Sequence, residues 1–164
     1  MASILIDQVL ALDAGGLTSS LSLKEQEGIK SILITHHHFD HIRDVATIGM
    51  NALSWGTIKL YSTTTVFDVL TSHVINDDIY PNFSERPFLE RPSLRLCPIE
   101  PLKPEVIDGY RVVAVPTRHN IPSVGYEVTS EDGKSLFYTS DTGPGLGSCW
   151  EVVSPNLLIT ELTV

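Results

Sequence analysis

The sequence contains few cysteines, few basic residues and no long hydrophobic run. Its two cysteines, Cys97 and Cys149, lie far apart and form no CxxC pair. This spacing argues against a disulfide framework and predicts reduced thiols in a cytoplasmic protein. Lys and Arg number 11 against 20 Asp and Glu, which argues against tight binding to a nucleic-acid backbone, although bound metal ions would still make a site locally positive. The apolar N-terminus has no basic region and carries Asp7 and Asp13, so it predicts neither a signal peptide nor a membrane span.

The chain reads as one domain of alternating strands and helices. No internal repeat, low-complexity segment or linker divides it, so we expect residues 1–164 to form a single domain. Apolar, β-branched segments predict strands at 4–13, 31–35, 57–61, 111–116 and 157–160, and a hairpin at 125–139. Helical spacing predicts helices at 17–28, 42–53 and 64–75, and six prolines predict an irregular loop over 81–104. This order favours a layered α/β architecture.

The most informative segment is Thr-His-His-His-Phe-Asp-His at residues 35–41, which holds four of the six histidines. Neutral imidazole offers a nitrogen lone pair near neutral pH, which makes histidine the commonest metal ligand in proteins. The segment comes directly after the predicted strand at 31–35. Irregular backbone at the C-terminal end of a buried strand can turn several side chains towards one point, so the pattern predicts a metal site. A chance surface cluster is the weaker interpretation.

The pattern His36-x-His38-x-Asp40-His41 resembles the HxHxDH signature of the metallo-β-lactamase superfamily of hydrolases. Three further segments are similar to motifs of that superfamily and occur in the same order, at residues 12–16 (LDAGG), 116–126 (PTRHNIPSVGY) and 138–143 (YTSDTG). Together the four motifs span most of the chain. The resemblance implies an αββα sandwich with the site at the edge between its two sheets.

The resemblance also implies a ligand set. The ligands of a first metal ion would be His36, His38, His119 and Asp141. The ligands of a second ion would be Asp40, His41 and the shared Asp141. This mixture of imidazole and carboxylate suits one or two Zn²⁺ per chain and would also accept Mn²⁺ or Fe. A hydroxide bridging two metals about 3.5–4 Å apart is a nucleophile at neutral pH, because coordination lowers the pKa of water to about 7. Asp40 is the candidate catalytic residue, placed to orient that hydroxide, and hydrolysis is the predicted reaction.

Two further carboxylates have supporting roles by resemblance, and each has a plainer alternative. The aspartate of the first motif, Asp13 here, supports the metal loop by contacting a ligand, or it simply caps the glycine turn. Glu161, at the end of the last predicted strand, could position a leaving group, or it could be an ordinary strand-end carboxylate.

The sequence departs from the superfamily pattern at both ends. No histidine follows His119, although the full fold has another histidine ligand downstream of the bridging aspartate, and the strand before the first motif is mostly missing. We therefore expect a fold that is incomplete at both ends, with a weaker second metal site. The exposed sheet edge left by such a truncation would favour a homo-oligomer.

Within the superfamily, the segments around His119 and Asp141 resemble the branch that contains ribonuclease Z and the class II cyclic-nucleotide phosphodiesterases. Residues 71–83 favour the second group. The 22 positions from His119 to Asp141 leave no room for the tRNA-gripping arm of short-form ribonuclease Z. The leading prediction is a metallo-hydrolase that cleaves a phosphodiester in a small or cyclic nucleotide. The alternatives are a ribonuclease Z-like tRNA 3′ endonuclease, a glyoxalase II-like thioesterase and, in another class, a catalytically weak metal-binding module.

Overall fold

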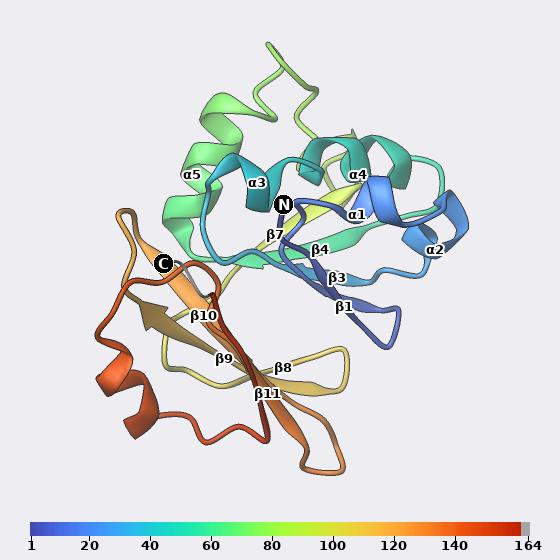
Figure 1. Cartoon of the computed structure of the whole chain (residues 1–164). Coiled ribbons are helices and arrows are strands. Elements are labelled where there is room, and N and C mark those ends of the chain that lie inside the picture. Colours follow the sequence, from blue (N-terminus) through green and yellow to red (C-terminus); the bar gives the residue numbers. More distant parts are fainter. Residues whose placement is uncertain (162–164) are drawn as a thin grey trace. The chain divides into compact units, whose positions relative to one another are not determined.

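The computed structural model describes residues 1–161. By their internal contacts the residues fall into two compact units, 1–98 and 99–164, and each unit carries one five-stranded sheet (Figure 1). The prediction of a mixed α/β fold is confirmed. Among the described residues, no helix is long and apolar enough to cross a membrane.

The sheet of the first unit is mainly parallel. Its strands, in spatial order, are β1 (Ile4–Ile6), β2 (Leu10–Leu12), β3 (Ser31–Leu33), β4 (Ile58–Ser62) and β7 (Leu94–Pro98). Only β1 and β2 are antiparallel neighbours, and the register from β2 through β7 is parallel. Because parallel strands end at the same edge of a sheet, the segments that follow β2 and β3 meet there.

Helices cover one face of this sheet (Figure 1). They are α1 (Leu17–Ser20), α2 (Leu23–Glu27), α3 (Phe39–Ile42), α4 (Val45–Ala52) and α5 (Thr64–His73). Val45 and Ile48 of α4 and Leu70 of α5 pack with Ile32 and Leu60 of the sheet, and all five side chains are fully buried. Burial of this apolar layer is the main stabilising contribution and fixes the ends of β2 and β3.

Two sequence predictions in this unit are wrong. The expected helix at 17–28 is broken at Leu21, and a new helix starts after Ser22. Ser22 and Glu25 form a capping box, in which each side chain accepts a hydrogen bond from the other residue's backbone N–H. The expected irregular loop at 81–104 contains β5 (Pro87–Phe88), β6 (Arg91–Pro92) and all of β7. Because β7 is an edge strand, proline is tolerated at its end.

The second unit has a mostly antiparallel sheet. Its strands are β8 (Glu105–Ile107), β9 (Tyr110–Thr117), β10 (Ser123–Thr129), β11 (Ser135–Tyr138) and β12 (Leu157–Ile159). Both β9 and β11 run antiparallel to β10, so they end at the same edge of the sheet. A 3₁₀ helix, η1 (Leu146–Glu151), packs its Cys149 against Val113, Val115 and Phe137. The predicted hairpin is confirmed, whereas β8 and η1 were not predicted.

Candidate metal centre

Asp13 is the buried anchor of the ligand loop in the first unit. It follows β2 with a left-handed backbone (φ 58°) and has no exposed surface. Its carboxylate accepts hydrogen bonds from Thr35 N (2.8 Å, at Oδ1) and from His41 Nδ1 (2.8 Å, at Oδ2). Burial raises the pKa of Asp13 above its ordinary value. Two neighbours oppose that rise: His41, by its hydrogen bond and its positive charge, and Thr35, by its hydrogen bonds. With Nδ1 donating to Asp13, Nε2 is the ring nitrogen of His41 that can bind a metal ion.

Thr35 extends the same anchor to His36. The Thr35 hydroxyl lies 3.0 Å from both carboxylate oxygens of Asp13 and 3.0 Å from His36 Nδ1. A carboxylate only accepts, and a hydroxyl has one hydrogen to donate. The hydroxyl therefore donates to Asp13 and accepts from the Nδ1–H of His36. We assign His36 the tautomer whose Nε2 carries a lone pair, so one buried carboxylate orients two histidines.

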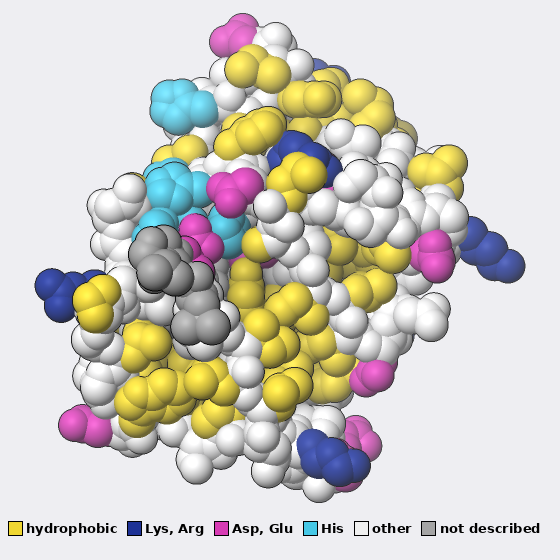
Figure 2. Space-filling model, in the orientation of Figure 1, with side chains coloured by type: hydrophobic (Ala, Val, Ile, Leu, Met, Phe, Trp, Pro, Cys, Tyr) yellow, Lys and Arg dark blue, Asp and Glu magenta, His cyan; other side chains and the backbone are white. Residues whose placement is uncertain are grey.

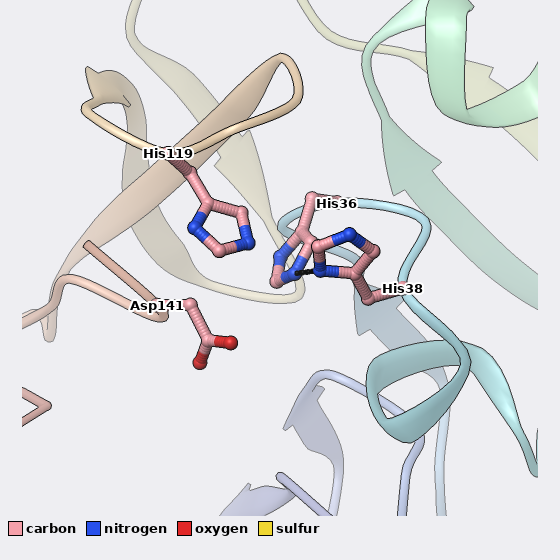
Figure 3. A group of neighbouring side chains, drawn as sticks. All are labelled: His36, His38, His119 and Asp141. Atoms are coloured by element: carbon pink, nitrogen blue, oxygen red, sulfur yellow. Dashed lines mark hydrogen bonds between the residues drawn. The ribbon is translucent and has the colours of Figure 1, made fainter. Parts of the chain in front are cut away.

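The positions of His36 and His38 fit two ligands of one metal ion. His36 Nε2 and His38 Nδ1 lie 3.1 Å apart and share a hydrogen bond, drawn as a dashed line in Figure 3. Two nitrogens bound tetrahedrally to Zn²⁺ at about 2.0–2.1 Å would lie roughly 3.3 Å apart. The spacing is therefore close to that of adjacent ligands. Imidazole nitrogens are also donors that bind divalent metals such as Zn²⁺, so both the spacing and the chemistry of these residues fit a metal ion.

Asp40 and His41 are placed by a short helix packed against a glycine. Helix α3 begins after His38, and the backbone oxygens of Asp40 and His41 accept hydrogen bonds from Ala2 N (3.1 Å) and Ala14 N (2.7 Å). A Cβ on Gly15 would lie 1.6 Å from the Asp40 backbone oxygen, so only glycine allows this approach. The Asp40 carboxylate is about half exposed and lies 3.5 Å from His41 Nε2. Of the predicted ligands in the first unit, Asp40 supplies the exposed carboxylate.

The second unit contributes His119 and Asp141, which follow β9 and β11 at the same sheet edge. Each offers a ligand atom within 4.8 Å of the other, and both are labelled in Figure 3. The turn before His119 holds the loop after Asp141, because the Arg118 backbone oxygen accepts from Gly143 N (2.5 Å) and the Arg118 guanidinium donates to Pro144 O (3.3 Å).

Glu161 also contacts the loop that follows Asp141. Its Oε2 accepts a hydrogen bond from Thr142 N at 3.1 Å. This contact fixes the backbone one residue beyond Asp141, so Glu161 supports the loop that carries a predicted ligand. A role in positioning a leaving group remains a prediction.

The structure thus places the predicted site residues in two groups. The first unit holds Asp13, His36, His38, Asp40 and His41, and the second holds His119, Asp141 and Glu161. Sequence reasoning did not identify Thr35 or Arg118. The only signal for Thr35 was its position directly before the histidines, and a threonine there is also an ordinary strand residue. Arg118 acts partly through its backbone oxygen, which no residue type reveals.

Comparisons with known proteins identify the family of this chain. A family model described as "Beta-lactamase superfamily domain" matches residues 3–164. A search of curated proteins found no match.

Solved structures with the same fold include several proteins of low sequence identity. Unliganded yeast PDE1 aligns with a TM-score of 0.67 and 21% identity, covering 77% of this chain and 39% of the yeast chain. The metallo-beta-lactamase fold protein YhfI from Bacillus subtilis aligns with a TM-score of 0.67 and 15% identity, covering 91% of this chain and 56% of the YhfI chain. The short form of human tRNase Z (ELAC1) aligns with a TM-score of 0.62 and 18% identity, covering 95% of this chain and 68% of the human chain.

The chain therefore spans about two-fifths of the yeast protein and just over half of the Bacillus protein. At these identities the likenesses show a shared fold. Because the family model extends over nearly the whole sequence, the chain belongs to the beta-lactamase superfamily domain family.

Proposed function

We propose that this chain is a metal-dependent hydrolase. The ligands we propose for a first ion are His36, His38, His119 and Asp141, and those for a second ion are Asp40, His41 and Asp141. The observation that carries the proposal is the buried Asp13–Thr35 network. It places the proton of His36 and of His41 on Nδ1, so Nε2 is the ring nitrogen of each that would bind a metal ion.

The remaining residues have defined roles in this proposal. A bound divalent metal supplies Lewis acidity, which lowers the pKa of water to about 7. The Asp40 carboxylate would accept a hydrogen bond from the attacking water and orient it, because it is half exposed beside His41. Asp13 holds His41 and, through Thr35, His36. Zn²⁺ is the proposed metal, and Mn²⁺ or Fe would also suit a mixed nitrogen and oxygen donor set.

A phosphodiester in a small or cyclic nucleotide is the substrate we propose. In support, yeast PDE1 and human tRNase Z, two of the structural neighbours, bear names that refer to phosphodiester cleavage. The residues between His119 and Asp141 form a turn, β10, a short connection and β11. No segment remains there for an arm that grips tRNA. On the face shown in Figure 2, Lys and Arg side chains are scattered rather than gathered, as expected for a small substrate.

Two further expectations remain proposals. Leu157 and Leu158 of the edge strand β12 are 55% and 43% exposed, which supports association into a homo-oligomer. A cytoplasmic location is favoured by the small number of cysteines. A thioesterase of the glyoxalase II type stays the alternative activity, because a metal-activated water also attacks acyl carbon.

The test combines metal content with turnover. Elemental analysis of purified protein should find up to two metal ions per chain, and bis(p-nitrophenyl) phosphate should be hydrolysed when Zn²⁺ or Mn²⁺ is added. Asp40→Asn should abolish turnover, whereas Asp68→Asn, the same change on an exposed position of α5, should not. Metal binding without hydrolysis of any phosphodiester or thioester would indicate the catalytically weak metal-binding module instead. Failure to bind metal would contradict the proposal.

A further inference from the structure

The first unit has a cavity of about 220 Å³ built from residues outside the candidate metal centre. It lies between the end of helix α4 and the β5–β6 hairpin. Leu53 and Trp55 line it from the first segment, and Phe88, Arg91 and Ser93 line it from the second. An apolar cavity of about 150 Å³ accommodates benzene, so this one has room for a ring and one small polar group.

Two polar side-chain atoms of the lining are buried and have no partner. Within residues 1–161, neither Trp55 Nε1 nor Ser93 Oγ makes a hydrogen bond. Ser93 is only 1% exposed, and its backbone is fully used: its N–H donates to Arg86 O (2.6 Å) and its oxygen accepts from Ile58 N (2.9 Å). A buried polar group without a partner costs about 1–3 kcal/mol, so a ligand acceptor that these groups reach by a small side-chain rotation would recover part of that free energy.

The residues that line the cavity carry positive charge and no negative charge. Arg91 is the only charged residue among those that line it. Its Nη2 lies beside Gly56, 3.7 Å from the point where a Cβ on that glycine would sit. Phe88 is 68% exposed and offers an aromatic wall at the rim. The chain as a whole carries a net charge of −9, which makes a cavity with a cation and no carboxylate a specific feature.

We propose that this cavity binds a small monocarboxylate with an aromatic or apolar body. The indole N–H of Trp55 can only donate, so the ligand must offer an acceptor. A guanidinium pairs with a planar carboxylate through parallel N–H···O bonds, and the single cation matches a single negative charge. The ring would pack against Phe88 and Leu53. This site is independent of the metal centre and of the function proposed for it.

The probe is phenylacetate, with phenylacetamide as its neutral counterpart of the same shape. In ¹⁵N-labelled protein, the two tryptophans give two indole N–H resonances, and the one that a Trp150→Phe chain retains belongs to Trp55. Phenylacetate should move the Trp55 resonance downfield in a saturable way and leave that of Trp150 in place. The acid should bind about fivefold more tightly than the amide, the ratio expected for one partly exposed charge pair.

Two variants assign the preference for the acid. Arg91→Gln should remove the difference between acid and amide, whereas Lys59→Gln, which removes a cation of β4 outside the cavity, should keep it. Ser93→Ala should weaken the binding of both probes. The proposal is overturned if neither probe gives a saturable shift at Trp55, if wild-type protein binds acid and amide equally, or if the Arg91→Gln chain keeps the full preference.

Discussion

Replacing Asp13 by asparagine separates the orienting role of this residue from its part in the fold. Asparagine tolerates the left-handed backbone at φ 58°. Its carbonyl oxygen can still accept from Thr35 N, but its amide nitrogen only donates. That nitrogen would face His41 Nδ1, which now donates to Asp13 at 2.8 Å. His41 would then accept at Nδ1 and carry its proton on Nε2, the atom proposed to bind metal.

The magnitude of the effect follows from these contacts. Loss of a group that orients a metal-bound histidine weakens metal affinity about 10- to 100-fold, which corresponds to about 1.4–2.7 kcal/mol. Asp13→Ala is a harsher change. It leaves the N–H of Thr35 and the Nδ1–H of His41 buried without an acceptor, at about 1–3 kcal/mol each. With about 1 kcal/mol for alanine in a left-handed conformation, the free energy of unfolding should fall by about 3–7 kcal/mol.

The assay is Zn²⁺ affinity, measured by competition with a chromophoric chelator, beside urea unfolding of the metal-free protein. Asp44→Asn is the matched control, because Asp44 is also buried and its carboxylate accepts from Thr18 N and Arg43, with no hydrogen bond to a predicted ligand among residues 1–161. It should lower stability and leave Zn²⁺ affinity unchanged. If Asp13→Asn lowers stability while Zn²⁺ affinity stays at the wild-type value, Asp13 only caps the glycine turn and the reasoning is wrong.

Three further outcomes are expected. Gly15→Ala should abolish turnover and destabilise the first unit, since its Cβ would lie 1.6 Å from the Asp40 backbone oxygen; an activity assay with thermal unfolding checks this, and full activity would contradict the geometry. Cys149 should react with a thiol reagent more slowly than the half-buried Cys97, because burial raises the pKa of Cys149; its rate should rise at higher pH, and mass spectrometry after alkylation measures both. Zn²⁺ at a hundredfold excess over its Kd should raise the free energy of unfolding by about 2.7 kcal/mol. The unfolding midpoint measured by calorimetry should therefore rise, and a chelator should reverse the rise. No shift of the midpoint would exclude binding to the folded state.

The parts of the fold that were predictable are those with a strong local signal. The strand before the histidines is a run of apolar, β-branched residues, and the structure places β3 there with no exposed side chain. The Ser22-x-x-Glu25 signature of a capping box was present and would have divided the expected helix at 17–28. The helical character of the surrounding residues favours one continuous helix, but in the structure the capping box begins a second helix.

Strand β7 was missed for a different reason. Pro92, shortly before this strand, and Pro98, its last residue, indicate a loop when only local preference is considered. Pairing with β4 decides the conformation instead, and Leu94 is fully buried beside Ile58. Likewise, the link from Asp13 through Thr35 to His36 joins residues 22 positions apart. Such contacts depend on the packing of β2 beside β3, which no local pattern reveals.

The backbone conformation is unusual beside both groups of predicted ligands. Among the described residues, those other than glycine with positive φ are Asp7, Gln8, Asp13, Asp77, Leu102, Asp108 and Ser140. Most of them lie in exposed or half-buried turns, where such a conformation is common. Only Asp13 and Ser140 are buried, at 0% and 2% exposure. Asp13 contacts His41, and Ser140 directly precedes Asp141.

A buried residue in a left-handed conformation costs about 1–2 kcal/mol and persists only where its surroundings require it. At Asp13 a second cost is added, because burial disfavours its charged form and raises its pKa. Packing alone would favour an apolar residue here, as at the neighbouring Leu12 and Ala14. The hydrogen bonds to Thr35 and His41 are what a carboxylate gains at this position. These bonds orient His41 and, through Thr35, His36, so the proposed role of both histidines as metal ligands accounts for an acid at position 13.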